Sequence, residues 1–410
     1  MTASTAEGAA VAVPSPKLIV PALGLTQILA WGSSYYLLAV LAQPISADTG
    51  WPLTWVVAGL SLGLLIAGLV SPLVGRQIHR RGGRPVLAAS AILIGTGQLG
   101  LALAPNLPTY IAAWILIGLG MGAGLYDAAF STLGRLYGHA ARHHITTLTL
   151  FGGLASTACW PLSAFLVTEL GWRGACGTYA AIHLLFSLPV YLIAIGDRHA
   201  PSWAEADKAL VGPAAAQQPQ RLRAIFILLA VAIMVSSTLT TLISVHLMTL
   251  LQSRGISLAA AVALGAMIGP AQVGARFTEM LISRYHHPIW TKIASVTFMA
   301  LGLGLFWAGI PLVAFALILY GAGIGLESIA RATLPLALFG AANYAPIMGK
   351  LAMPSLIAQA AAPSLGAMLI AGLGAEATLG TVGIVALGNF ALGMVLLAMT
   401  APLRRLPARD

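Results

Sequence analysis

The chain has 410 residues, of which 59% are hydrophobic and only 8% are charged. Soluble globular proteins carry about 25% charged residues, so these few charges could not cover the surface of a soluble fold. The composition excludes a soluble enzyme, a secreted disulfide scaffold, a disordered chain and a nucleic-acid binder. It predicts an all-α polytopic membrane protein, because helices satisfy every backbone polar group inside a bilayer.

Hydrophobic stretches long enough to cross a bilayer recur along the whole chain. A spanning helix needs about 20 apolar residues, and this criterion predicts twelve transmembrane helices in two six-helix, pseudo-symmetric bundles. The first six cover residues 18–42, 54–74, 86–104, 109–133, 146–168 and 174–196. The second six cover residues 224–250, 257–282, 291–309, 312–334, 351–372 and 379–401.

Three polar segments lie outside the predicted bundles. Residues 1–17 predict a disordered cytoplasmic N-terminus, residues 197–223 a cytoplasmic linker, and residues 402–410 a cytoplasmic tail. The bundles are therefore expected at residues 18–196 and 224–401.

The positions of the basic residues predict the orientation in the membrane. With the N-terminus inside, every Lys and Arg except Arg173 and Arg254 falls on the cytoplasmic side, and Lys292 is counted there. Basic residues favour the cytoplasmic side, so topology explains the net charge of +10 without a nucleic acid. We expect a monomeric, multi-pass protein of the inner membrane with both termini in the cytoplasm.

The two halves also resemble each other in sequence. A shift of 201 to 202 residues lays the glycine-rich residues 120–125 over residues 321–326. The same shift lays Gly138 over Gly340 and brings two prolines together. Parallel six-helix repeats with a binding site between them are typical of alternating-access transporters.

Several ionisable residues lie inside predicted spans, where charges are costly and usually functional. Glu327 and Arg331 stand four apart in the tenth span, on one helical face, so we expect them to pair. We assign both to the substrate cavity and Glu327 to proton coupling, with Asp127 as the competing acid. Arg276 and Glu279 stand three apart in the eighth span and are assigned to a cytoplasmic gate.

Aromatic and amide side chains predict the rest of the cavity. Gln27, Trp31 and Tyr35 recur at every fourth position of the first span and so form one face of the helix. Trp160 in the fifth span and Tyr320 in the tenth are assigned to the same mixed polar and aromatic cavity. The sequence contains no hydrolytic triad, phosphate loop or metal-binding motif, so we expect no enzyme activity, no metal and no cofactor.

The loop after the second span carries a motif. Residues 75–84 read GRQIHRRGGR, which resembles the Gly-x-x-x-Asp-Arg-x-Gly-Arg-Arg signature of the major facilitator superfamily. His79 stands where that family usually has Asp. In the family this loop latches the two halves together on the cytoplasmic side. The resemblance therefore implies, for a bacterial member of the family, a gate made of Gly75, Arg76, His79, Arg80, Gly82 and Arg84.

Two expectations follow from this latch. A bulky residue at Gly75 or Gly82 should block close approach of the helices. His79, with arginines close by, should make the conformational balance sensitive to pH.

The resemblance covers the whole chain and implies a secondary active transporter that works by alternating access. The aromatic cavity with few central charges favours proton-coupled efflux of a small uncharged or amphipathic compound. One alternative is uptake or exchange of a small organic anion, as in monocarboxylate or oxalate carriers, with Arg276 or Arg331 as counter-ion. The other is a membrane scaffold or receptor without transport. The expected partners are a small-molecule substrate, the lipid bilayer and protons.

Overall fold

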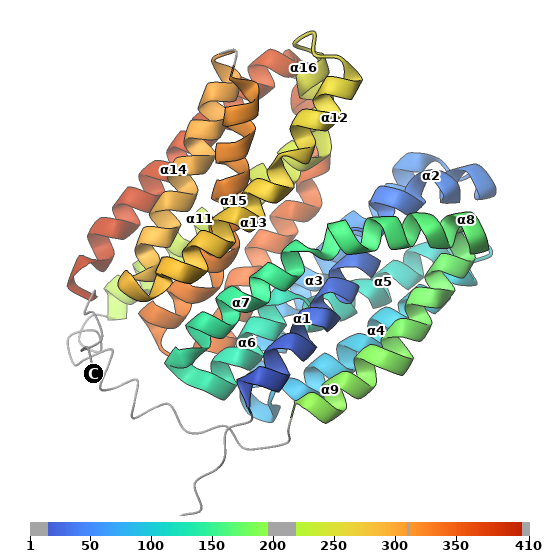
Figure 1. The fold of residues 1–410 in the computed structure, drawn as a ribbon, viewed down its shortest axis with the longest axis horizontal. Coiled ribbons are helices and arrows are strands. Elements are labelled where there is room, and N and C mark those ends of the chain that lie inside the picture. The colour runs from blue at the N-terminus through green and yellow to red at the C-terminus, as the bar shows by residue number, and fades with distance from the viewer. Residues whose placement is uncertain (1–14, 196–218, 310–311, 404–410) are drawn as a thin grey trace, which may run out of the picture.

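The computed structural model describes residues 15–195, 219–309 and 312–403, and every regular element in these ranges is a helix. Figure 1 shows their arrangement. The first half comprises α1 (Pro16–Ser33), α2 (Leu38–Thr49), α3 (Leu53–Arg81), α4 (Gly83–Ala102), α5 (Leu107–Gly124), α6 (Tyr126–Tyr137), η1 (Gly138–Ala140), α7 (Ala141–Gly153), α8 (Ala155–Ile182), η2 (His183–Ser187) and α9 (Leu188–Ala194). The second half comprises α11 (Pro219–Gln252), α12 (Leu258–Ala266), α13 (Ile268–Ile282), η3 (Ser283–Tyr285), α14 (Pro288–Trp307), α15 (Val313–Phe339), α16 (Tyr344–Thr400) and η4 (Ala401–Leu403).

The described residues contain nine helical stretches that are long and apolar enough to cross a membrane. Two long helices are interrupted by glycines, α8 at Gly171 with φ 69° and α16 at Gly374 with φ 82°. Both glycines have ψ near 170°, a conformation that other residues essentially cannot adopt. One continuous stretch with such a break can contain two spans. The number of twelve spans therefore stays a prediction.

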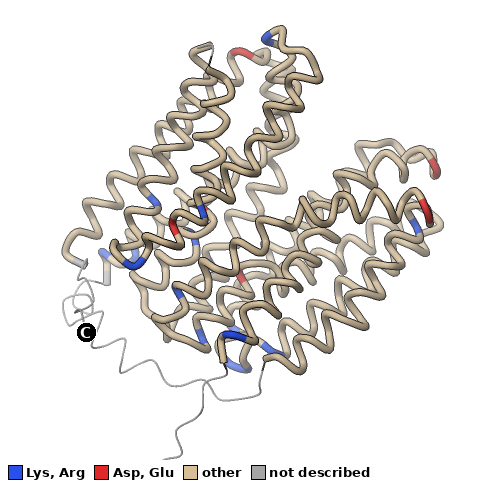
Figure 2. The backbone as a smooth tube through the Cα atoms, viewed as in Figure 1, with Lys and Arg blue, Asp and Glu red and all other residues tan. Residues whose placement is uncertain are grey.

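The helices gather into two groups that meet at one end of the molecule. The groups, α1 to α9 and α11 to α16, lie together where α1 begins, α9 ends and α11 begins, and they diverge towards α2 and α12 (Figure 1). We call the meeting end the terminal end. Figure 2 shows Lys and Arg gathered towards the terminal end and few at the opposite end. This distribution agrees with the predicted orientation, in which the terminal end faces the cytoplasm.

Close packing holds the two groups together at the terminal end. A Cβ atom on Gly75 of α3 would lie 2.3 Å from the Ala345 carbonyl oxygen of α16. A Cβ atom on Gly349 of α16 would in turn lie 2.3 Å from the Ser71 carbonyl oxygen. The buried Tyr344 ring extends the contact into an apolar cluster with residues of both groups. The two helices touch backbone to backbone, which only glycine permits at these positions.

The repeat is visible in the structure, but in a different register from the one that the sequence suggests. Gly120 packs against Ile94 of α4, and Gly323 packs against Met299 of α14 in the same way, 203 positions later. The breaks at Gly171 and Gly374 are also 203 positions apart. The shift of 201 between the glycine-rich segments is therefore wrong by two, because glycines alternate there and several registers align them equally well.

Two predicted boundaries move. Residues 219–223, assigned to the linker, open α11, and residues 16–17, assigned to the N-terminal segment, open α1. Both helices begin at a proline, which favours the first helical turn because it has no N–H to satisfy. Residues 1–14, 197–218 and 404–410 of the predicted tails and linker lie outside the described ranges.

Candidate functional site

A cavity of about 960 Å³ lies between the two groups of helices. Its lining comes from both groups and includes most of the residues that the sequence assigns to substrate binding or coupling. The structure brings together Trp31, Tyr35, Asp127, Trp160, Tyr320, Glu327 and Arg331 around it. Arg276, assigned to the gate, also lines this cavity.

Gln27 does not line the cavity, in contrast to the sequence-based expectation. Its side chain is fully buried, and its amide nitrogen donates a hydrogen bond to the Gly124 carbonyl oxygen at 2.6 Å. That carbonyl lies where α5 ends and the extended Leu125 separates it from α6. Because α1 ends at Ser33, Tyr35 does not share a helical face with Gln27, and Gln27 stabilises the break between α5 and α6 instead.

An aromatic wall follows from an interruption of the first span. The α-helix α1 ends at Ser33 and α2 begins at Leu38, and the turn between them carries Tyr35 and Tyr36. The ring centroids of Trp31 and Tyr35 lie 5.2 Å apart, those of Trp31 and Tyr126 5.0 Å, and those of Tyr36 and Trp160 6.2 Å. Sequence periodicity missed Tyr36 and Tyr126, because both stand beside helix breaks that the pattern does not reveal.

Arg276 is a buried cation in the cavity wall. Its guanidinium donates to the Thr149 carbonyl oxygen at 3.0 Å and to the Ser328 hydroxyl at 3.1 Å, and the whole residue is only 6% exposed. Thr149 belongs to α7 in the opposite half, so Arg276 joins the two halves. No carboxylate among the described residues forms an ion pair with Arg276. Glu279, three positions further along the chain, has other partners.

A close ion pair between the halves joins Asp127 of α6 and Arg331 of α15. The Asp127 Oδ2 atom lies 2.6 Å from Arg331 Nη2, and both residues line the cavity. Oδ1 of Asp127 and Nε of Arg331 are buried without a hydrogen-bond partner within the described part of the chain. The pair therefore bridges the halves with unused hydrogen-bonding capacity on each side.

Glu327 pairs with Lys292 rather than with Arg331. The Lys292 Nζ atom lies 2.6 Å from Glu327 Oε1, and the Ser295 hydroxyl donates to Oε2 at 2.8 Å. Lys292 has no exposed surface, so its charge is held inside the protein by Glu327, whereas its predicted cytoplasmic side stays a prediction. The four-residue spacing on α15 predicted the wrong partner for Glu327. The reason is that α14 packs tightly against α15 at Gly323 and presents Lys292 to Glu327. The Arg331 side chain reaches across to the other half.

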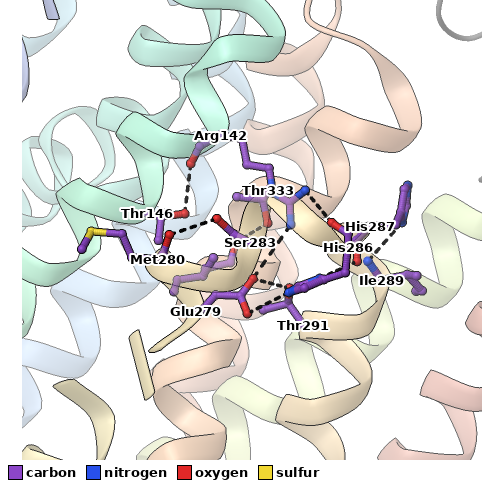
Figure 3. Close-up of polar contacts among 11 residues, drawn as sticks. Arg142, Thr146, Glu279, Met280, Ser283, His286, His287, Ile289, Thr291 and Thr333 are labelled. Carbon is purple, nitrogen blue, oxygen red and sulfur yellow. Dashed lines mark hydrogen bonds and ion pairs between the residues drawn. The ribbon is translucent and has the colours of Figure 1, made fainter. Parts of the chain in front are cut away.

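Another polar cluster connects the two halves, and Figure 3 shows its contacts. Glu279 accepts a hydrogen bond from the Thr291 hydroxyl at 2.7 Å and lies 3.4 Å from His286 Nε2. Arg142, from the opposite half, donates to the His286 carbonyl oxygen at 2.8 Å and lies 3.9 Å from Glu279. His286 lies between η3 and α14. The hydrogen bond with Glu279 raises the pKa of His286 above its ordinary 6.5. The cluster places a histidine at a contact between the halves.

The motif loop has two kinds of glycine. Gly75 makes the close approach between α3 and α16, whereas Gly82 ends α3 with φ 86° and ψ 171°. Gly82 is thus required by backbone conformation and not, as expected, by packing, because a Cβ atom there would meet nothing closer than 3.9 Å.

The charged residues of the loop lie at its surface or contact backbone. Arg135 donates to the His79 carbonyl oxygen, and the His79 side chain is exposed. Arg76 donates to the Pro72 carbonyl oxygen at 3.3 Å, Arg80 is exposed and Arg84 is half-buried. Their gate role stays a prediction.

One family model matches most of the chain. The model described as "Major Facilitator Superfamily" matches residues 23–349. The structure of the human organic anion transporter MFSD10 (TETRAN) has a TM-score of 0.69 at 18% identity, covering 93% of this chain and 100% of that chain. The proton:xylose symporter XylE has a TM-score of 0.67 at 14% identity, covering 92% of this chain and 94% of its own. These two likenesses show the fold alone.

Two relatives are similar in sequence over shorter segments. The niacin transporter NiaP of Acinetobacter baylyi is 26% identical over 127 residues, which are 31% of this chain and 27% of that protein. Monocarboxylate transporter 13 of Rattus norvegicus is 30% identical over 198 residues, which are 48% of this chain and 44% of that protein. The chain thus spans less than half the length of these relatives.

Proposed function

The chain belongs to the major facilitator superfamily of membrane transporters, and we propose that it carries a small organic anion across the membrane by alternating access. Among the alternatives that the sequence leaves open, the geometry of the cavity favours this one. In the predicted orientation the cytoplasmic end is closed and the cavity belongs to the outward-facing state.

The observation that carries the proposal is the charge of Arg276. Two other basic residues near the cavity have acidic partners: Lys292 pairs with Glu327, and Arg331 pairs with Asp127. Arg276 has only neutral acceptors among the described residues. A buried cation without a counter-ion is costly, and a substrate carboxylate would supply the missing charge. The aromatic wall offers apolar surface for the rest of the molecule.

Substrate binding would also act on the contact between the halves. Arg276 uses one of its donors to hold the Thr149 carbonyl oxygen of the opposite half. A carboxylate adds opposite-charge attraction and a bidentate geometry to its hydrogen bonds with a guanidinium, which a neutral carbonyl oxygen does not. A bound carboxylate would therefore draw the guanidinium away from Thr149 and weaken the closed end.

We further propose that protons couple through Asp127 rather than Glu327. A coupling acid must change its surroundings when the halves move, and the Asp127–Arg331 pair crosses between the halves. Glu327 and Lys292 both belong to the second half and would move together. Protonation of Asp127 would release Arg331 and free the halves to separate at the cytoplasmic end.

Proton-coupled efflux of an uncharged or amphipathic compound is the second candidate. The aromatic wall of Trp31, Tyr35, Tyr36 and Trp160 favours it. Such a substrate would leave Arg276 without a counter-ion, so we rank this function lower. A scaffold without transport has no use for ionisable residues in a cavity of this size.

Purified protein in vesicles tests the proposal, with radiolabelled benzoate and pyruvate as probes and an imposed pH gradient. We expect accumulation of at least one carboxylate and its loss in Arg276→Ala, with partial activity in Arg276→Lys. Uncharged benzamide is the matched control and should not be accumulated. Equal flux of benzamide and benzoate, unaffected by Arg276→Ala, would replace the anion proposal by the second candidate.

A further inference from the structure

The interruption of the first span replaces regular helical hydrogen bonds by turns inside the membrane. Residues 34–37 form turns between α1 and α2, and the Tyr36 N–H donates to the Trp31 carbonyl oxygen at 3.0 Å, five residues back. A membrane provides no water for the carbonyl groups freed by such a break. Other side chains must therefore satisfy them.

Side chains from two neighbouring helices hold Ser33, the last residue of α1, and one of them satisfies its carbonyl group. The Gln98 amide of α4 donates to the Ser33 carbonyl oxygen. The His183 Nε2 atom, at the start of η2, lies 2.7 Å from the Ser33 hydroxyl oxygen. All three residues are at most 1% exposed. The last residue of α1 is thus held at both its carbonyl and its side chain.

The hydrogen-bond pattern shows which residue is the donor between Ser33 and His183. The Ser33 hydroxyl lies 2.7 Å from the Leu29 carbonyl oxygen, which can only accept. A hydroxyl has one proton, so Ser33 donates it to Leu29 and must accept from His183. His183 therefore carries a proton on Nε2 and acts as the donor to Ser33.

Local structure brings His183 to this place. Residues His183–Ser187 form a π-helical turn, a feature frequent at functional sites. Gly95 of α4 lets this turn approach, since a Cβ atom there would lie 2.8 Å from the Leu184 side chain and 3.3 Å from that of His183. Gln98 follows one helical turn after Gly95, so the same face of α4 receives η2 and reaches Ser33.

We propose that His183, Ser33 and Gln98 form a positioning cluster that fixes the break between α1 and α2 and so determines the shape of the aromatic wall. Trp31 and Tyr35 flank Ser33 in the chain and line the cavity, whereas none of the three cluster residues does. The cluster would act on substrate selection through these rings. The expected effect of the cluster on substrate selection rests on the proposed transport of organic anions.

The first experiment needs no substrate. Hydrogen exchange of the protein in lipid nanodiscs, followed by mass spectrometry, reports on peptides covering residues 30–40. Removing the donor in His183→Ala should raise deuterium uptake there, and Ser33→Ala should do the same. His183→Gln keeps an N–H near the Nε2 position and should restore protection. Ser34→Ala is the matched control, because that hydroxyl bonds only to the carbonyl oxygen of Ala30, one turn back in the same segment, at 2.5 Å.

The second experiment measures selectivity in vesicles. Aromatic contacts contribute about 0.5–1.5 kcal/mol per pair, equivalent to roughly two- to tenfold in affinity. His183→Ala should therefore raise the KM for benzoate by this factor and leave the KM for pyruvate unchanged, because pyruvate relies on Arg276. His183→Gln should restore the benzoate value.

The outcomes separate the two proposals. Wild-type protein that transports neither carboxylate contradicts the proposed function, while the exchange experiment still tests the cluster. Unchanged exchange in folded His183→Ala and Ser33→Ala would overturn the positioning cluster. An equal rise of both KM values would overturn its role in selectivity, because it would show a general loss of structure.

Discussion

Asp127 and Arg331 connect the two halves of the molecule through atoms only 2.6 Å apart, at the wall of the central cavity. Asp127 stands in the first turn of α6, where the partial positive charge of the helix N-terminus also favours an anion. The pair forms only while the halves are close, so its proton occupancy and the conformation of the transporter are linked.

Asp127→Asn should uncouple transport from the proton gradient. The amide cannot release a proton or form the ion pair, so uphill accumulation should be lost while exchange of substrate across the membrane continues. Loss of the contact should also shift the population towards opening at the terminal end, by about 1–3 kcal/mol or roughly 5- to 150-fold. Vesicle accumulation under a pH gradient, compared with counterflow, measures the first effect, and spin-label distances across the terminal end measure the second.

Asp48 provides a matched control for this prediction. It belongs to the same half as Asp127, and its carboxylate accepts a hydrogen bond from the Trp172 indole at 2.8 Å. It does not line the cavity, so Asp48→Asn should leave coupling intact. Wild-type accumulation by Asp127→Asn would assign the coupling proton to another group.

Lys292 and Glu327 should contribute to stability as a pair. Lys292→Met leaves a buried carboxylate without its counter-ion, and breaking a buried ion pair typically costs about 3–5 kcal/mol. The double variant Lys292→Met/Glu327→Gln removes both charges and should recover most of the loss. Thermal unfolding in detergent measures these differences. A double variant no more stable than Lys292→Met alone would contradict the pairing.

The sequence predicted the membrane class and the family because these depend on composition, span length and a local motif. It also assigned Trp31, Tyr35 and Tyr320 to the substrate cavity, and these three residues line it. It missed the burial of Lys292, which stands near a span end as a topology signal would, because burial depends on how α14 packs on α15. It failed for Gln27 and His183 because helix breaks change the direction of side chains, and hydrophobic periodicity carries no signal for such breaks.

Gly75 should tolerate no side chain if the closed end is to form. Gly75→Leu would force α3 and α16 apart, and overpacking of this kind costs about 1–3 kcal/mol, which corresponds to roughly five- to 150-fold in the population of the closed state. Spin-label distances between α3 and α16 at the terminal end should lengthen, and transport should fall by a similar factor. Gly177→Leu is the control, because a Cβ atom there meets nothing within 4 Å. Normal distances in inserted Gly75→Leu protein would contradict the latch.

His286 should make the stability of the folded protein depend on pH. Its hydrogen bond with Glu279 raises the pKa of His286 above 6.5, and the nearby Arg142 opposes this rise only in part. A raised pKa means that the folded structure binds the proton more tightly than the unfolded chain. The resulting stability is fully present below pH 6.5 and is lost as the pH rises through the raised pKa.

Melting temperatures between about pH 5.5 and 8.5, a range that brackets the ordinary titration of histidine, test this expectation. The advantage of the wild type over His286→Gln should be largest at the acidic end and should shrink as the pH rises. His79→Gln is the control, because the exposed His79 side chain lies at the same end of the molecule. If His79→Gln removed the pH dependence and His286→Gln did not, the titrating group would be the histidine of the motif loop, as the sequence alone suggests.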